Sequence, residues 1–170
     1  LDKLPPVFWT GGTVTAGNSA PSCDGAAVVA VGSAGFQRKH KRKPMARIVG
    51  YSSIAVTPEN VFEYTNTAIE ACLKECRLQL RDIDFFEISE AFAAQIILVE
   101  RKKKIPRSKI NAFGGDLALG HPLGTAGARI LVTLLNVLRD QKKKRGLACV
   151  SFGGGGAIAM VIERVVSNPF

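Results

Sequence analysis

The fold is indicated most directly by the stretch IDFFEISEAFAAQIILVERKKKIPRSKINAF, which occupies residues 83–113. Its first part, residues 83–88, is a short apolar run rich in Ile and Phe, which is typical of a buried strand. From Glu90 onward apolar residues recur at helical spacing, and residues 109–113 form another short apolar run. A strand, a helix and a strand in this order predict two parallel strands joined by a right-handed crossover.

The same alternation continues on both sides of this stretch. The further predicted elements are a strand at 46–53, a helix at 66–80, a helix from Pro122, and strands at 146–152 and 157–166 joined by GGGG. The order β-α-β-α-β-α-β-β predicts an α/β fold. We expect a mixed five-stranded sheet with helices on both faces, formed by residues 46–170, whose last two strands make an antiparallel hairpin.

Residues 1–45 do not fit into this alternating unit. Residues 1–25 are rich in Gly, Pro, Ser and Thr, as loops are, whereas AAVVAV at 26–31 has the pattern of a buried strand. A short polar helix and a basic run at 38–43 follow this strand. Because a wholly apolar strand suits a sheet covered on both faces, we expect residues 26–31 to pair with another chain or to lie next to protein outside this one.

Composition places the chain among ordinary globular proteins. It has 170 residues, of which 46% are hydrophobic and 22% charged, enough for one domain and a piece of another. No apolar run approaches the roughly 18 residues of a membrane span, and the first residues do not resemble a signal peptide. The four cysteines match no metal or disulfide framework. We therefore expect free thiols, no metal site and an intracellular, reducing compartment.

The formal net charge of +9 comes largely from basic runs at 38–43, 101–104 and 142–145. Such runs can bind nucleic acid. Two of the three lie at predicted helix C-termini, where lysines complement the helix dipole, and no aromatic residues are interleaved with them. Nucleic-acid binding is therefore the less favoured interpretation of this charge.

Polar groups gather at one predicted edge of the sheet. In an open α/β sheet, ligands bind beyond the carboxyl ends of the parallel strands. Ser89, Gly114, Gly115 and the run from Ser151 to Gly154 follow such ends, and His121 lies in the glycine-rich loop after the strand at 109–113. A histidine, two serines and exposed main-chain amides should therefore meet there.

His121 stands directly before Pro122, a residue suited to the first position of a helix. His121 is then the expected N-cap, where the positive helix end favours a neutral ring able to donate a hydrogen bond to an oxyanion. The alternative is a purely capping histidine with neighbouring glycines for tight packing. Ser89 before Glu90 likewise fits a helix cap, and GGGG fits a simple turn.

Taken together, four segments resemble the C-terminal half of the thiolase superfamily. SEAFAAQ at 89–95 resembles the family's N-E-A-F motif, and ALGHPLGTAGARIL at 118–131 matches its G-H-P motif. SFGGGGAIAMVIER at 151–164 resembles the C-x-G motif with its glycine turn. GTVTAGNSAPSCDGAA at 12–27 is similar to the segment that contacts the pantetheine arm of coenzyme A.

The resemblance implies roles for the matching residues. His121 corresponds to the histidine that activates a nucleophilic cysteine and helps bind the thioester oxyanion, and Gly153 to the glycine whose amide shares the second oxyanion hole. Ser19, Ala20 and Phe92 correspond to positions beside the pantetheine of CoA. The resemblance also implies two similar five-stranded halves, the first of which residues 12 to about 40 would complete.

The chain departs from the family pattern at its acid/base positions. Ser89 stands in place of the N-E-A-F asparagine that anchors a water, and Ser151 in place of the C-x-G cysteine that exchanges protons in the enolate step. A serine hydroxyl is far too weak an acid to replace that thiol unaided. Phe62 and Tyr64 stand where smaller residues usually lie near the acyl pocket.

The nucleophilic cysteine of thiolases belongs to the N-terminal half, which this chain does not contain. Cys149 is a weak substitute, because it lies two residues before Ser151 and thus about 6–7 Å deeper along the strand.

We therefore expect a thiolase-like, CoA-dependent acyltransferase of the acetoacetyl-CoA or 3-ketoacyl-CoA type with impaired or altered Claisen chemistry. The alternative is a non-catalytic acyl-CoA binding protein. Coenzyme A is expected as substrate, with no permanently bound cofactor. The expected partners are acyl-CoA and the N-terminal thiolase half, and a homo-oligomer is allowed for. The resemblance is compatible with a mitochondrial or peroxisome-type location.

Overall fold

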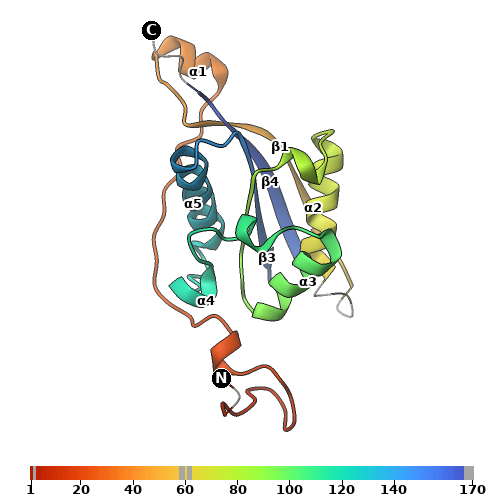
Figure 1. Cartoon of the computed structure of the whole chain (residues 1–170). Coiled ribbons are helices and arrows are strands. Elements are labelled where there is room, and N and C mark those ends of the chain that lie inside the picture. Colours follow the sequence, from red (N-terminus) through yellow and green to blue (C-terminus); the bar gives the residue numbers. More distant parts are fainter. Residues whose placement is uncertain (2, 58–59, 61–62, 167–170) are drawn as a thin grey trace.

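A computed structural model describes residues 1, 3–57, 60 and 63–166 (Figure 1). Its helices are α1 (Ala34–Lys39), α2 (Tyr64–Glu75), α3 (Ala93–Lys103), α4 (Asp116–Leu119) and α5 (Ala126–Asp140). Its strands are β1 (Ala46–Ala55), β2 (Phe85–Ile88), β3 (Arg145–Phe152) and β4 (Gly156–Arg164). Short 3-10 turns lie at Ala16–Asn18, Leu80–Asp82 and Arg107–Lys109.

The four strands form one mixed sheet in the order β1-β4-β3-β2. Strands β2 and β3 are parallel, whereas β4 pairs antiparallel with both β3 and β1. The β3–β4 hairpin turns through Gly154 and Gly155, whose φ angles of 91° and 84° lie in the left-handed region that glycine tolerates. The predicted α/β class, the mixed sheet and the terminal hairpin are confirmed.

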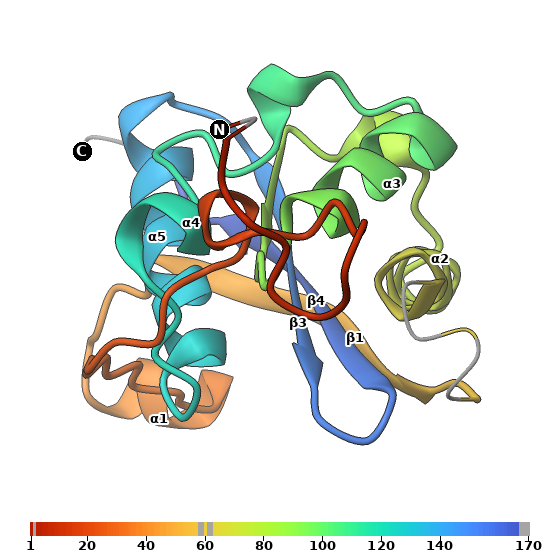
Figure 2. The same cartoon turned by 90° about the horizontal axis from the view of Figure 1, so that it is seen from below.

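Helices cover both faces of this sheet, as predicted (Figures 1 and 2). Helices α2 and α3 lie on one face, over a core that includes Ile69, Phe86 and Val161. Helix α5 lies on the other face and packs Ile130, Leu134 and Leu138 against β3 and β4. Successive side chains of a strand point to opposite faces of the sheet, so the apolar side chains of the strands are divided between these two cores.

The fifth predicted strand, residues 109–113, is reduced to a single bridge between Ile110 and Phe86. Asn111 adopts a left-handed φ of 48°, which turns the chain away from the sheet. Its side chain continues the pairing instead: Oδ1 accepts from the Ile88 amide at 2.8 Å and Nδ2 donates to the Ile88 carbonyl at 3.0 Å. The expectation of five full strands is corrected to four strands and this side-chain bridge.

The strand predicted at residues 26–31 is not formed. The segment is irregular, and Val28 and Val31 are 89% and 76% exposed. It runs on the α5 side of the molecule toward α1, whose N-terminus is capped by Ser33 (Figure 1). A strand requires a partner, and none of the described strands lies beside this segment. The predicted short polar helix after it is confirmed as α1.

Part of the sheet remains uncovered on the α5 side. Tyr51 pairs with Met160, which contacts the α5 core, so both side chains lie on this face. Among the described residues, helix α5 contacts mainly β3 and β2 and, to a smaller extent, β4, whereas Ile48 and Tyr51 of β1 and Ile158 of β4 are exposed. We call the exposed side chains Ile48, Tyr51 and Ile158 the open sheet patch.

Candidate functional site

The carboxyl ends of the parallel strands β2 and β3 border one hollow of about 370 Å³. Its lining comes from the start of α2, the loop after β2, the loop before α5 and the glycine turn after β3: Tyr64, Ala91, His121, Leu123, Ala126, Ser151, Phe152, Gly153, Gly154 and Gly155. The structure thus brings His121, Ser151 and Gly153 together at the predicted edge of the sheet. Ser89 does not line the hollow.

Polar contacts fix both the main chain and the ring of His121. Its amide donates to the Pro21 carbonyl at 2.8 Å, and its Nδ1 lies 2.9 Å from Oδ2 of Asp116. The side chain is 17% exposed, so it is largely enclosed yet still reaches the hollow. Gly120 allows this approach of residues 21–25, because its φ is 92° and an added Cβ would lie 2.6 Å from Sγ of Cys23.

His121 is not the helix cap that the sequence predicted. Helix α5 begins at Ala126, with Thr125 as its N-cap. Pro122 instead opens a turn in which the Thr125 amide donates to the Pro122 carbonyl at 2.8 Å. The imidazole is therefore governed by a carboxylate rather than by the end of a helix dipole.

Asp116 is the central polar residue that the sequence interpretation missed. It is fully buried, and its Oδ2 accepts from the Ser89 hydroxyl at 3.0 Å and from the Glu90 amide at 2.8 Å, besides contacting His121. Its Oδ1 contacts Nη2 of Arg129. An acidic residue five positions before the histidine, and an arginine within the apolar pattern of α5, were the available signals.

Ser89 is also not a helix cap. Helix α3 begins at Ala93 with Phe92 at the N-cap position, so Ser89 lies in the loop that follows β2. Its side chain is fully buried and donates to Asp116. Ser89 therefore lies outside the lining of the hollow, and the Asp116 carboxyl group that it contacts also contacts His121.

Two further carboxyl groups, Glu87 and Glu90, lie in the same buried region. Burial raises the pKa of Glu87 to about 7, and the positive charge of Arg129 opposes this rise. Burial also raises the pKa of Glu90, opposed by the hydrogen bond from the Leu117 amide and by Arg107. Glu87 and Glu90 thus lie with Asp116 and Arg129 in a group of titratable and charged side chains in a low-dielectric environment, and Asp116 is the member that contacts His121.

The residues expected beside a pantetheine arm come together as well. Ser19 forms an antiparallel bridge with Phe92, and the Ala20 amide donates to the Ala91 carbonyl at 2.9 Å. The Phe92 ring packs edge-on against Phe8, with ring centroids 6.0 Å apart. Segment 12–27 therefore borders the loop after β2 (Figure 2).

Phe62 and Tyr64 were expected near an acyl pocket, and the structure describes one of the two. Tyr64 is buried and lines the hollow. Phe62 lies outside the described residues.

The cysteines near the sheet are poor nucleophiles. Burial raises the pKa of Cys149 to about 12, and burial with the neighbouring Cys76 raises the pKa of Cys72 to about 12. Both thiols stay protonated near neutral pH, and only a thiolate attacks a thioester readily. The burial and the raised pKa of Cys149 therefore weigh against it as a nucleophile. Within the described residues, no cluster of His, Cys, Asp or Glu could hold a metal ion.

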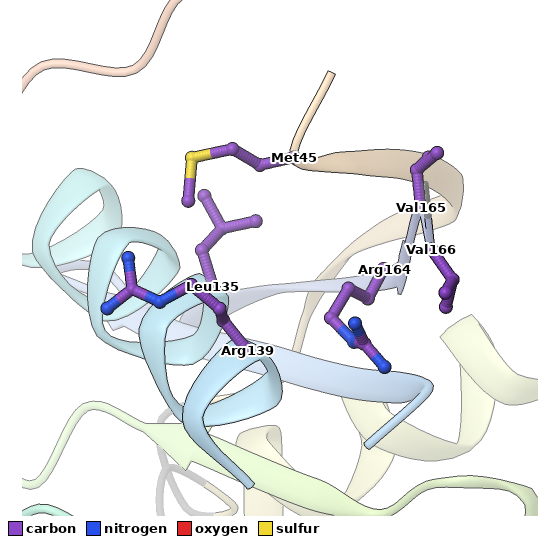
Figure 3. A pocket seen from close by; sticks show the side chains of 6 residues that line it. All are labelled: Met45, Leu135, Arg139, Arg164, Val165 and Val166. Carbon is purple, nitrogen blue, oxygen red and sulfur yellow. The ribbon is translucent and has the colours of Figure 1, made fainter. Parts of the chain in front are cut away.

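A second hollow, of about 270 Å³, lies at the opposite end of the sheet (Figure 3). Met45, Leu135, Val165 and Val166 line it together with Arg139 and Arg164. Both arginines already have partners, since Arg139 pairs with Asp140 and Nε of Arg164 donates to the Lys143 carbonyl at 2.7 Å. It contains none of the predicted site residues.

The basic runs lie at helix ends, as predicted. Arg101, Lys102 and Lys103 occupy the last turn of α3, and the run at 142–145 follows the end of α5. Lys102 and Lys103 form ion pairs with Glu63 and Glu70 of the neighbouring α2 region. Within the described part of the chain, no helix is both long and apolar enough to span a bilayer.

Comparison with known proteins gives a consistent result. Residues 42–164 match the family model described as thiolase, C-terminal domain. A probable acetyl-CoA acyltransferase of Staphylococcus aureus strain N315 is 44% identical over 164 residues, which cover 96% of this chain and 42% of that protein.

Solved structures show the same relationship. The crystal structure of the Bacillus anthracis acetyl-CoA acetyltransferase superimposes with a TM-score of 0.93 at 39% identity, covering 96% of this chain and 42% of that one. Human mitochondrial 3-ketoacyl-CoA thiolase in complex with CoA gives a TM-score of 0.89 at 40% identity, covering 97% and 42%. The chain thus spans less than half the length of the proteins it matches.

Proposed function

Because the chain belongs to the thiolase family, whose C-terminal domain it matches over residues 42–164, we propose that it supplies one side of the active site of a CoA-dependent acyltransferase. The observation that carries this proposal is the single hollow shared by His121, Ser151 and Gly153. The family relatives include a probable acetyl-CoA acyltransferase and a 3-ketoacyl-CoA thiolase in complex with CoA. An acyl-CoA thioester is the corresponding substrate.

Each side chain has a distinct part in this proposal. His121 accepts the proton of an attacking thiol, and donors at the hollow stabilise the negative charge that develops on the thioester oxygen. The exposed turn at Gly153 offers a main-chain amide without a side chain in the way, since no atom lies within 4 Å of an added Cβ there. Ser19, Ala20 and Phe92 form the approach for the pantetheine arm.

The nucleophile and the rest of the active site come from the remainder of the family fold, on another chain or another part of the same protein. The buried state of Cys72 and Cys149 supports this division. The open sheet patch and the exposed segment 26–31 are the surfaces proposed to receive that remainder, because both leave apolar side chains in water.

Ser151 sets the expected limit on the chemistry. Forming or breaking a carbon–carbon bond next to a thioester requires an acid/base group that exchanges a proton at the α-carbon. A serine hydroxyl ionises far above neutral pH, whereas a thiol can be brought into range. We propose that acyl transfer persists while the Claisen step is impaired or altered.

The test is a cleavage assay with acetoacetyl-CoA and CoA on the whole protein that contains this chain. Ser151→Cys should raise the rate by about tenfold or more, since general acid–base catalysis contributes about 10²–10⁴-fold. Ser108→Cys, which adds a thiol at an exposed position away from the hollow, is the matched control and should leave the rate unchanged. Wild-type cleavage as fast as that of Ser151→Cys would contradict the impairment.

A second candidate function is acyl-CoA binding without turnover. Ser151 favours it, because the hollow is kept while the acid/base thiol is absent. Titration calorimetry with CoA, run beside the cleavage assay, separates the two functions. Saturable binding with no turnover of any short acyl-CoA supports binding alone, whereas turnover supports the transferase.

A further inference from the structure

Asp116 occupies a position under His121 that the family resemblance does not explain. Its carboxyl group is fully buried and contacts three donors, the Ser89 hydroxyl, the Glu90 amide and Nη2 of Arg129, and also the ring nitrogen Nδ1 of His121. Three of these contacts converge on Oδ2, and the guanidinium takes Oδ1. A buried carboxyl group with this many hydrogen-bonding partners is fixed in orientation.

The partners also fix the protonation pattern of the network. The Glu90 amide and the Arg129 guanidinium can only donate, so both oxygens of Asp116 must act as acceptors. A protonated carboxyl group could aim its O–H only at Nδ1 of His121, and it would lose the charge-assisted pairing with the Arg129 guanidinium on Oδ1. Asp116 is therefore a carboxylate, and the nitrogen of His121 that faces it carries a proton.

This pattern determines which ring nitrogen of His121 is available for chemistry. In a neutral imidazole one nitrogen donates and the other accepts. With the proton on Nδ1, the lone pair that can accept a proton is on Nε2. The His121 side chain that carries it lines the hollow.

We propose that Asp116 is a positioning residue that holds His121 in the Nδ1–H tautomer, ready to receive a proton at Nε2. The chemical step rests on the proposed function: the S–H bond of a thiol breaks, its proton bonds to Nε2, and a thiolate remains to attack the thioester. The imidazolium formed in this step stays beside the Asp116 carboxylate, which offsets its charge. Histidine–aspartate pairs in other enzymes work by the same physical logic.

The other charged groups of this region support the arrangement. Arg129 balances the carboxylate from α5, and Glu90 is engaged by the Leu117 amide at 3.3 Å and by Arg107 at 3.8 Å. Glu87 lies on β2, and burial raises its pKa to about 7, so much of it is neutral near pH 7. Within the described residues, Asp116 is the charged side chain that hydrogen-bonds the imidazole.

The tautomer can be measured directly, because the chain holds only two histidines. Nitrogen-15 NMR of the chain with labelled histidine, at a pH where the ring is neutral, distinguishes protonated from unprotonated ring nitrogens. His40, at the C-terminal end of α1 with its ring against Phe36, serves as the internal reference. The Nδ1–H form of His121 should exceed the other by about tenfold or more, the effect of a hydrogen bond to a charged acceptor.

Asp116→Asn should lower the ratio of the Nδ1–H form to the other tautomer by about tenfold. An amide has only one oxygen, so it can offer an acceptor either to the groups now at Oδ2 or to Arg129, but not to both. The matched control is Asp84→Asn, which neutralises a structural carboxylate that accepts from the Lys144 and Arg145 amides, both at 2.9 Å. It should leave the His121 signals unchanged. If Asp116→Asn does not fold, the wild-type spectrum still decides: a proton on Nε2 overturns the proposal.

Activity provides a separate readout. In the whole protein, Asp116→Asn should lower kcat for acyl transfer at least about tenfold while KM for acyl-CoA changes little. An unchanged kcat together with an altered tautomer would overturn the role in proton transfer. A wild-type protein without acyl transfer but with the Nδ1–H tautomer would contradict the proposed function and leave the tautomer assignment standing.

Discussion

Glu87 lies on β2, and this carboxyl-bearing residue is buried, with only 1% of its surface exposed. Burial raises its pKa from 4.5 to about 7 in the folded protein. The folded state therefore holds this proton more tightly than the unfolded state does. The stabilisation is fully present below about pH 4.5 and is lost as the pH rises through about 7.

Replacing this carboxyl group should remove that part of the pH dependence. Glu87→Gln cannot lose a proton, so its stability relative to wild type should rise by roughly 3 kcal/mol between pH 4.5 and pH 8.5. Urea unfolding of both proteins at the two pH values measures this difference. Glu75→Gln, at an exposed site on α2, is the control and should show little change. Parallel pH profiles for Glu87→Gln and wild type would contradict the prediction.

At the scale of elements, the edge of the sheet beside β2 depends on one side chain. Asn111 replaces the main chain of a fifth strand with two side-chain hydrogen bonds to Ile88, at 2.8 and 3.0 Å. Its left-handed φ of 48° also suits Asn better than most residues. This bridge sets where the loop leaves for Asp116 and His121.

Asn111→Ala should lower the free energy of unfolding by about 2–4 kcal/mol, because it leaves buried main-chain groups without partners and strains the backbone. Asn136→Ala is a matched control on α5, where the side chain makes one local bond to the Val132 carbonyl. That change should cost little, since Ala favours the helix. Chemical denaturation followed by circular dichroism compares them, and equal losses would show that Asn111 does not hold this edge.

At the scale of the whole molecule, the open sheet patch should make the isolated chain associate with itself. Tyr51 is 64% exposed and Ile158 is 38% exposed on one uncovered face, and segment 26–31 is largely exposed as well. Apolar area left in water costs about 25 cal/mol per Å², which favours burial against any available surface. We also expect the chain alone to show no acyl-CoA cleavage.

Sedimentation and sizing chromatography of residues 1–170 test this association. The double variant Tyr51→Lys and Ile158→Lys should shift the chain toward a monomer, because a charge on the patch opposes its burial. Ile97→Lys is the control, since Ile97 is 45% exposed on α3, on the other side of the sheet. A monomeric wild-type chain with acyl-CoA cleavage activity would contradict both expectations.

The sequence by itself determined the order of the elements and the edge at which the polar groups meet. Hydrophobic periodicity is a local property, so it identified β1, α2, β2, α3, α5 and the terminal hairpin without knowledge of the fold. Parallel strands end at one edge, and this topological rule was enough to bring His121, Ser151 and Gly153 to the same hollow.

Only the tertiary structure decided which groups touch. It replaced the helix cap at His121 with Asp116, tied Ser89 to the same carboxylate, and substituted the Asn111 side chain for a strand. It also left residues 26–31 unpaired, because a strand exists only where a partner supplies its hydrogen bonds. Some of these contacts join residues that are far apart in the chain, and others depend on the φ angle of one residue. Local sequence patterns do not encode such pairings, because they form only when the elements pack in three dimensions.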